Sequence, residues 1–427
     1  MEQVVIVSGV RTAVANFGGS LKNTPAVDLG AAVIRETLKK AKLRPVVSTV
    51  PGPASLADQG IIPLESEVQD WDQTNTPITI DEVIMGNVLQ AGQGQNPARQ
   101  AMIRGGVPKE TPAFTINKVC GSGLKAITLA AASIMAGQAR AVIAGGMENM
   151  SMTPMALPKA RWGHRMEVTG QGQVTDLLVY DGLYEKFYGY HMGVTAENIV
   201  KKYGISRHEQ DELSALSHSR ARAAITTGLF KDEIVPIIIP SRKGDIIFDT
   251  DERPMETSLE KLAKLRPVFD REGSVTAGNA SGINDAAAAV LVMSASYAKE
   301  LGLTPLLVIR GFGSGGLDPA YMGLGPVPAI NRALAQANVS LADIDAIELN
   351  EAFAAQALAC IRELDLATEL PNQMGSGISI GHPIGCTGAR QVVTGMHYMA
   401  REQKRMGLFS MCIGGGMGMA MIAERSE

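Results

Sequence analysis

The sequence predicts an α/β protein made of two similar halves with a different segment between them. Two observations carry this prediction: short β-rich runs alternate with helical patterns along most of the chain, and the same succession of elements occurs twice. Alternation of this kind indicates mixed, βαβαβ-type sheets covered by helices. A succession that repeats indicates a duplicated fold. We expect loops at corresponding positions of the two copies to converge on one site.

The first copy spans about residues 1–149 and is completed after the middle segment by residues 284–304. Its β-rich runs and its apolar residues at helical spacing predict the following elements. They are strands at Val4–Val10, Ile80–Gly86, Ala113–Lys118 and Ala141–Ala144, and helices at Asp28–Leu43, Pro97–Arg104 and Leu124–Met135. Residues 44–77 interrupt this copy with five prolines and little periodicity. We interpret them as a surface insertion, because they carry too little apolar surface to offset their ordering entropy.

The second copy spans about residues 305–427 and repeats the first. Its corresponding segments are Leu306–Gly311, Pro328–Gln336, Ile344–Asn350, Gly377–Gly388 with the helix after it, and Phe409–Met417. In the middle segment, residues 150–283, Ser206 and Glu209 form a capping-box pattern that opens a helix at Arg207–Thr226. Basic residues gather in this middle segment. They form either an ordinary solvated face or a patch that binds a phosphorylated ligand. They are Lys159, Arg161, Arg165, Arg253, Lys261, Lys264, Arg266 and Arg271.

Composition limits the class of protein. With 427 residues, of which 45% are hydrophobic, the chain can bury a large interior in two or three domains. Its net charge of −4 argues against a surface that binds nucleic acid or anionic membrane as a whole. Four scattered cysteines do not make a disulfide framework and indicate a reducing compartment. There is no basic secretory leader and no apolar run of ~18 residues, so we expect a cytoplasmic protein without a membrane partner.

Cys120 lies on a glycine-rich turn, Asn117–Gly123, directly before a predicted helix. The unpaired N–H groups and the positive dipole end of a helix N-terminus favour a thiolate, which is the nucleophilic form of cysteine. A lone free cysteine is more often inert core packing. The turn by itself leaves both interpretations open.

Three loops of the second copy carry further polar chemistry. Asn350 follows a strand, where a side-chain amide can serve as an oxyanion donor. His382 occupies the place that Cys120 occupies in the first copy, and Cys412 opens a glycine-dense strand end with free N–H groups. Each residue alone also has an ordinary structural explanation. A zinc site built from Cys120, His382, Cys386 and Cys412 is a further alternative, because thiolates and imidazoles bind zinc.

Taken together, these loops resemble the active-site motifs of the thiolase family. The matching segments are Val119–Leu124, Asn350–Gln356, Gly381–Arg390 and Cys412–Gly418, and Phe187–Gly193 and Thr276–Gly282 resemble the family's coenzyme A loops. The resemblance covers nearly the whole chain except residues 44–77. It implies a layered αβαβα architecture with a loop domain between the two halves.

The resemblance also implies the chemistry. Cys120 is expected to attack an acyl-CoA carbonyl and to hold the acyl group as a thioester, while His382 takes the thiol proton. Cys412 is expected to remove a proton from the methyl group of a second acetyl-CoA, or to return one in the reverse direction. Asn350 would hold a water that stabilises the enolate together with His382, and the N–H groups of Cys120 and Gly414 would receive the acyl-enzyme oxyanion. No metal and no redox cofactor are implied, since the coenzyme A thioesters are substrates.

Residues of the coenzyme A path follow from the same resemblance. They are Arg253, Leu265, Phe269, Ala277 and Ser281 along the nucleotide and pantetheine, with Met322 and Phe353 near the reactive end. The spacing from Arg253 to Ser281 is one residue longer than the familiar pattern. Met155 stands where short-chain members often have a histidine, and Met374–Gly377 replaces a more usual Asn-Gly-Gly-Ala run.

Within the family, the segment Tyr188–Gly193 and the residue Met322 favour a thiolase that condenses two acetyl-CoA into acetoacetyl-CoA and CoA. The alternatives are a longer-chain 3-ketoacyl-CoA thiolase of β-oxidation, and a thiolase-fold scaffold that docks in a multienzyme complex through residues 44–77. Thiolases form dimers or tetramers, so we expect a homodimer or homotetramer. The family's tetramerisation loop corresponds to about Met150–Asp181, where Trp162, Met166 and Val168 are expected to pack on another subunit.

Overall fold

The computed structural model describes residues 2–48, 52–53, 55, 60–163, 165 and 172–426. Within them, one hydrogen-bonded sheet of eleven strands runs through both copies, in the order β17-β18-β19-β16-β1-β15-β7-β5-β6. Beside this series, β12 pairs with β1, and β2 (Ala15–Asn16) pairs with β15. The strands of the first copy are β1 (Val4–Thr12), β5 (Glu82–Gly86), β6 (Ala113–Ile116), β7 (Ala141–Asn149) and β15 (Asn284–Ser294). Those of the second copy are β16 (Leu307–Gly316), β17 (Ala346–Leu349), β18 (Met406–Ile413) and β19 (Met417–Arg425).

The two copies have the same strand arrangement. In the first, β1 pairs antiparallel with β15, β15 antiparallel with β7, and β7 parallel with β5. In the second, β16 pairs antiparallel with β19, β19 antiparallel with β18, and β18 parallel with β17. A short antiparallel pairing of β1 with β16 joins the copies, with Val5 opposite Val308 and Ile6 opposite Leu307. The predicted duplication is therefore confirmed.

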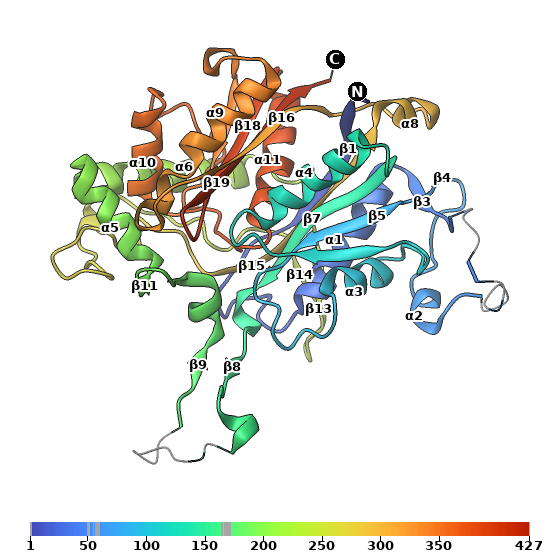
Figure 1. Cartoon of the computed structure of the whole chain (residues 1–427), viewed down its shortest axis with the longest axis horizontal. Helices are drawn as coiled ribbons and strands as arrows, with labels where there is room; N and C mark the ends of the chain where they lie inside the picture. Colours follow the sequence, from blue (N-terminus) through green and yellow to red (C-terminus); the bar gives the residue numbers. More distant parts are fainter. Residues whose placement is uncertain are drawn as a thin grey trace.

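Helices form three layers around these strands (Figure 1). Between the copies, α4 (Ser122–Met135) packs against α11 (Thr387–Arg401), and both contribute to one central core with the inner faces of the strands. The outer face of the first copy is covered by α1 (Ala26–Lys40) and α3 (Pro97–Arg104). That of the second is covered by α9 (Pro326–Ala337) and α10 (Ala354–Glu363). The predicted α/β fold with its αβαβα layering is confirmed.

The middle segment has its own short elements. They are β8 (Met155–Ala156), β9 (Thr175–Asp176), the π-helical turn η4 (Leu178–Leu183), β10 (Tyr184–Glu185), β11 (Tyr190–His191), α5 (Met192–Tyr203), α6 (Arg207–Thr226), β12 (Ile234–Val235), β13 (Ile237–Ile239), β14 (Ile246–Phe248) and α7 (Leu259–Ala263). The Ser206 capping box and the bounds of α6 agree with the prediction. The β8–β9 arm projects away from the body (Figure 1). On it Trp162 is 78% exposed, whereas Met166 and Val168 lie outside the described residues.

Two expectations about the first copy need correction. The helix predicted to reach Leu43 ends at Lys40, because Leu43–Pro45 forms a strand, β3, that pairs with β4 (Thr76–Ile78). The insertion, residues 44–77, is also not confined to the surface. Trp71 is buried in the core of the first copy, with the Arg35 guanidinium 4.5 Å above its ring. Glu65, in α2 (Pro63–Ser66), is buried too and accepts the Lys109 N–H at 2.7 Å. Single anchoring residues of this kind leave no periodic signal in a sequence.

None of the helices in the described ranges has the length and apolar character needed to cross a membrane.

Candidate active site

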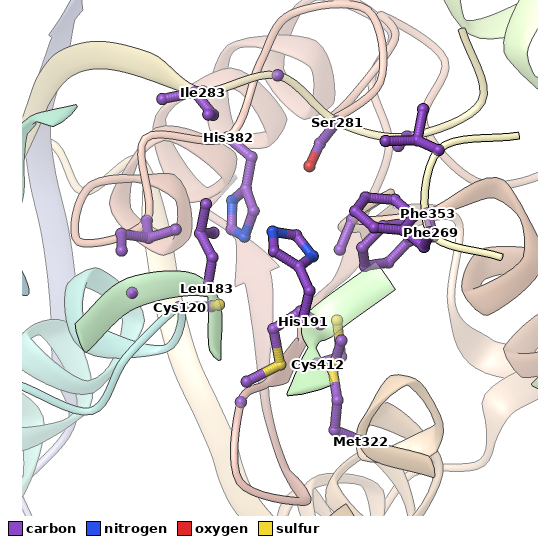
Figure 2. Close-up of a pocket in the computed structure, with 18 of the residues that line it drawn as sticks. Cys120, Leu183, His191, Phe269, Ser281, Ile283, Met322, Phe353, His382 and Cys412 are labelled. Carbon is purple, nitrogen blue, oxygen red and sulfur yellow. The ribbon is translucent and has the colours of Figure 1, made fainter. Parts of the chain in front are cut away.

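A cavity of about 320 Å³ lies where loops of both copies and of the middle segment meet (Figure 2). Four of the predicted catalytic residues line it: Cys120, His382, Cys412 and Gly414. Five of the predicted coenzyme A residues line it as well: Phe269, Ala277, Ser281, Met322 and Phe353. Most of the remaining wall is apolar, so a ligand that enters leaves water behind and meets few polar groups.

The chain reaches Cys120 through a strained turn between β6 and α4. Val119 has a φ of +47°, which is an unfavourable conformation for a β-branched residue. Hydrogen bonds hold it there: the Asn117 side chain accepts the Val119 N–H at 2.9 Å, and Ser122 Oγ donates to the Val119 carbonyl at 2.6 Å. Ser122 Oγ in turn accepts the Lys118 N–H at 2.8 Å. Backbone strain that neighbouring hydrogen bonds hold in place is typical of functional turns. This turn presents Cys120 to the cavity.

Burial decides the charge state of the Cys120 thiol. It raises the pKa of Cys120 to about 11, although the N–H groups of Gly414 and of Cys120 itself act in the opposite direction. The helix N-terminus effect that we expected at this position is therefore outweighed. In these surroundings Cys120 is a neutral thiol, and it needs a base to become a nucleophile.

His382, the predicted base, is held in a defined tautomer. Its Nδ1 lies 2.7 Å from Thr387 Oγ1, and the Thr387 hydroxyl also lies 2.9 Å from the Pro383 carbonyl. The hydroxyl has one proton, which it donates to that carbonyl, so Oγ1 accepts from Nδ1–H. His382 Nε2 then carries the lone pair, and it is buried without a hydrogen-bond partner among the described residues. Burial lowers the pKa of His382 to about 3, which keeps the imidazole neutral.

Cys412 and Gly414 stand at the end of β18. Cys412 is fully buried, and this burial together with the neighbouring Cys120 places the pKa of Cys412 well above its usual range. Beyond Gly414, the chain turns through Gly415 and Gly416 at φ values of +81° and +77°, which only glycine adopts without strain. This turn leaves the Gly414 N–H free to bond the Cys120 thiol.

Asn350 follows β17 and lies behind the cavity wall. Its side-chain nitrogen is 3.5 Å from His382 Nδ1, and its Oδ1 is buried without a hydrogen-bond partner among the described residues. An unpaired buried oxygen of this kind is a natural site for a bound water. The structure thus places Asn350 beside His382, while its predicted role through a water stays a prediction.

Two predicted coenzyme A residues do not line the cavity. Arg253 donates from Nε to the Ile378 carbonyl at 2.7 Å and from Nη2 to the Ala280 carbonyl at 3.0 Å, and burial lowers its pKa to about 10. The bond to Ile378 ties the middle segment to the second copy, and the bond to Ala280 lies within the middle segment. Leu265 is 39% exposed and packs beside Gly278 of the predicted coenzyme A loop. Coenzyme A contacts by these two residues stay predictions.

Sequence reasoning gave no role to Glu148, which joins the two copies under the site. Its carboxylate accepts four hydrogen bonds within 3.2 Å, from Asn87 Nδ2 and from the backbone N–H groups of Val88, Leu89 and Gly385. Gly385 belongs to the His382 loop, so Glu148 fixes that loop against the end of β5. An acid inside a buried strand, β7, was the available signal.

The family models of known proteins agree with this geometry. The N-terminal thiolase domain matches residues 4–50 and 71–296, and the C-terminal thiolase domain matches residues 303–425. The chain belongs to the thiolase family. Residues 51–70, which no thiolase domain matches, fall inside the predicted insertion.

Curated relatives and solved structures give the same result. This thiolase is 50% identical to proteins named acetyl-CoA acetyltransferase from Cupriavidus necator and from Escherichia coli K12, over the full length of both chains in each case. A solved acetyl-CoA acetyltransferase from Syntrophomonas wolfei superposes with a TM-score of 0.90 at 38% identity, covering all of both chains. Within the described ranges no three His, Cys, Asp or Glu side chains gather as metal ligands, so the zinc alternative has no geometric support.

Proposed function

We propose that this thiolase is an acetyl-CoA C-acetyltransferase, which condenses two acetyl-CoA into acetoacetyl-CoA and CoA and catalyses the reverse cleavage. The observation that carries the proposal is the unpaired Nε2 of His382, a neutral base in one cavity with the thiols of Cys120 and Cys412. The full-length relatives of that name support the choice of substrate. The proposed reaction uses no metal and no redox cofactor.

Acylation begins at Cys120. His382 Nε2 takes the thiol proton, and the sulfur forms a bond to the acetyl carbonyl carbon. The carbonyl oxygen becomes an oxyanion, which the N–H groups of Cys120 and Gly414 receive; each well-aimed donor contributes about 3 kcal/mol. The bond to the CoA sulfur then breaks, and CoA leaves with a proton from Cys412. The site now holds acetyl-Cys120, the Cys412 thiolate and protonated His382.

Condensation restores both thiols. The Cys412 thiolate removes a methyl proton from the second acetyl-CoA, and the enolate oxygen accepts hydrogen bonds from His382 Nε2–H and from a water held by Asn350. The enolate carbon forms the new bond to the acetyl carbonyl carbon of acetyl-Cys120. Cys120 leaves as a thiolate and regains the proton from His382. The Cys120 proton returns from His382, the Cys412 proton leaves on CoA, and the methyl proton of the second acetyl-CoA takes its place on Cys412.

Cleavage assays with two substrates test the proposed acyl preference. CoA-dependent cleavage of acetoacetyl-CoA should proceed with a higher kcat/KM than cleavage of a longer 3-ketoacyl-CoA. Met150, Leu183 and Ile384 narrow the cavity with apolar side chains next to Cys120, which supports a short acyl group. A higher kcat/KM for the longer substrate would replace this proposal with the β-oxidation thiolase.

We also propose a homodimer or homotetramer in the cytoplasm. The exposed Trp162 on the projecting β8–β9 arm supports association through this arm. Sedimentation of the wild type and of Trp162→Ala tests it, since the variant should shift toward the smaller species. Full catalytic activity of the purified protein alone would set aside the scaffold alternative.

A further inference from the structure

Asn284 is a buried polar residue that the proposed reaction does not use. It opens β15, the strand between β1 and β7 in the first copy, and its side chain is fully buried. The residue before it, Ile283, lines the cavity together with His382 (Figure 2). Asn284 therefore stands next to the wall that carries the predicted base.

The side chain of Asn284 makes two hydrogen bonds of opposite sense. Its Oδ1 accepts the backbone N–H of His382 at 2.9 Å, and its Nδ2 donates to the Ala15 carbonyl at 3.0 Å. Ala15 belongs to β2, which pairs with β15 at this point. A flipped amide would set donor against donor and oxygen against oxygen, so the orientation is determined. The nitrogen is thus anchored in the first copy, while the oxygen holds a loop of the second.

Close packing leaves this amide little freedom to move. A side chain at Gly381, which has a φ of +119°, would approach the Asn284 amide to 2.6 Å, and one at Gly282 would approach Oδ1 to 2.7 Å. The chain can pass so closely over Asn284 because a glycine directly precedes His382. The start of the His382 loop therefore has a defined position relative to β15.

Thr387 and Asn284 constrain His382 in different ways. The Thr387 hydroxyl bonds the ring from the second copy, to which His382 also belongs. That contact sets the tautomer, but it does not set the direction from the ring to Cys120, which belongs to the first copy. Asn284 bonds His382 itself from the first copy. It is therefore placed to set the base in register with the nucleophile.

We propose that Asn284 is a positioning residue, whose hydrogen bond to the His382 backbone N–H holds this loop where Nε2 meets the Cys120 thiol. The inference rests on the proposed function, in which His382 takes the proton of Cys120. A base must lie within hydrogen-bond reach of the proton that it takes, and a displacement of about 1 Å can cost about 100-fold in rate. Asn284 acts through His382 and touches no reacting atom.

Two variants weaken this tie to different extents. Asn284→Ala removes both hydrogen bonds of the side chain. Asn284→Asp keeps an oxygen for the His382 N–H but sets a second oxygen against the Ala15 carbonyl, so the anchor is lost. Thr37→Val is the matched control, because Thr37 Oγ1 donates to the Ala289 carbonyl of the same strand at 3.2 Å and neither residue lines the cavity. Thermal unfolding of the three variants is measured first.

The rate of Cys120 acylation by acetyl-CoA is then measured by rapid quench, in the wild-type background and in His382→Asn. In the wild-type background, Asn284→Ala should lower this rate about 30-fold, Asn284→Asp about fivefold and Thr37→Val less than about twofold. The steady-state KM for acetyl-CoA should change less than about threefold, since Asn284 touches no substrate. In His382→Asn, both Asn284 variants should change the rate less than about twofold, because the group that they misplace is already absent.

Other outcomes overturn the inference. An unchanged acylation rate in Asn284→Ala would show that this hydrogen bond does not aim the base. An equal fall in both backgrounds would show that Asn284 acts on the fold or on another part of the site. If Asn284→Ala does not fold, the same two criteria apply to Asn284→Asp. A wild type that does not acetylate Cys120, or a His382→Asn variant that does so at the wild-type rate, would instead contradict the proposed function.

Discussion

The loop that presents Cys120 and the loop that presents His382 are corresponding elements in two copies of one fold, and they carry opposite halves of the proposed chemistry. Each leads into a central helix, α4 or α11, and these helices pack against each other. Each is braced by a hydroxyl near the start of its helix, Ser122 in the first copy and Thr387 in the second. Duplication therefore supplies two corresponding loops, although the reactive side chains stand at different positions in them: Cys120 lies two residues before α4 and His382 five residues before α11.

The difference between the loops lies in what burial does to each group. The same apolar surroundings raise the pKa of Cys120 to about 11 and lower that of His382 to about 3. Both groups are therefore neutral at rest, which avoids an isolated buried charge. The close approach of the loops also depends on small residues: a side chain at Gly146 or Gly86 would collide with the Gly385 carbonyl or with the backbone of α4. We therefore expect the thiolate and the imidazolium to form only when substrate is bound and its carbonyl oxygen becomes an oxyanion.

The largest expected effect separates the two thiols. Cys120→Ala should lower kcat/KM for acetoacetyl-CoA cleavage by at least about 10⁴-fold, because no acyl-enzyme can form. Cys412→Ala should also abolish steady-state condensation, yet it should still let Cys120 accept an acetyl group from a good donor. Steady-state assays combined with intact mass distinguish these cases. Equal loss of acylation in both variants would contradict the division of labour between the thiols.

Removal of the base should have the next largest effect. His382→Asn should lower the rate of Cys120 acylation by about 10³-fold, within the usual range for general bases. Thr387→Val should lower the same acylation rate by about 10- to 100-fold, because His382 keeps its ring but loses the hydrogen bond that fixes its tautomer. Rapid-quench acylation rates measure both. Wild-type rates in Thr387→Val would show that the hydroxyl does not set the tautomer.

Loss of the Glu148 hydrogen bonds that join the two copies should lower activity less than loss of the base does. Glu148→Gln keeps the shape of the side chain but turns one acceptor oxygen into a donor that faces backbone N–H groups. We expect unfolding to become easier by about 1–3 kcal/mol and kcat to fall about tenfold as the Gly385 loop loosens. Urea unfolding and steady-state kinetics measure the two effects. As a control, Glu300→Gln, on an exposed pair with Arg140, should change neither.

The smallest expected effect concerns pH and stability. Burial lowers the pKa of His382 to about 3 and that of His218 to about 4, so below pH 6.5 each of these two rings binds fewer protons in the native state than in the unfolded chain. Their contribution to stability is present above pH 6.5 and is lost as the pH falls toward these values, by about 1.4 kcal/mol per pH unit for each histidine. Glu148 and Glu348 act in the opposite direction, because burial raises their pKa values to about 7 and about 8. Urea unfolding of the wild type and of His218→Gln at pH 7 and at pH 5.5 therefore isolates one histidine: on lowering the pH, the unfolding free energy should fall more, or rise less, in the wild type than in the variant. An equal change in both proteins would contradict the neutral state of His218.

Much of the fold is accessible from the sequence because its signals are local and repeated. The helix predicted at Pro97–Arg104 has its bounds as predicted, since Asn96 caps it and Pro97 opens it. The repeated succession of elements is enough to assign Cys120 and His382 to corresponding loops of the two copies. Where signals are single residues, the prediction is wrong or incomplete: Leu43 belongs to a strand, and Trp71 anchors an insertion that was predicted to be surface.

The parts of the site that the sequence does not reveal depend on individual hydrogen bonds, some local and some between distant segments. The tautomer of His382 follows from the hydroxyl of Thr387, and the role of Glu148 follows from four donors in two loops. None of these has a sequence pattern. The position of Arg253 likewise depends on carbonyl partners that no motif marks.

The central claim is that the first copy supplies the nucleophile and the second copy the base. The most direct measurement is a brief incubation with acetyl-CoA followed by peptide mass mapping, in the wild type and in His382→Asn. We predict one acetyl group on the peptide that contains Cys120 in the wild type, and little or none at the same early time in the variant. An acetyl group on the peptide of Cys386 or Cys412, or equal early labelling of Cys120 in both proteins, would contradict this account.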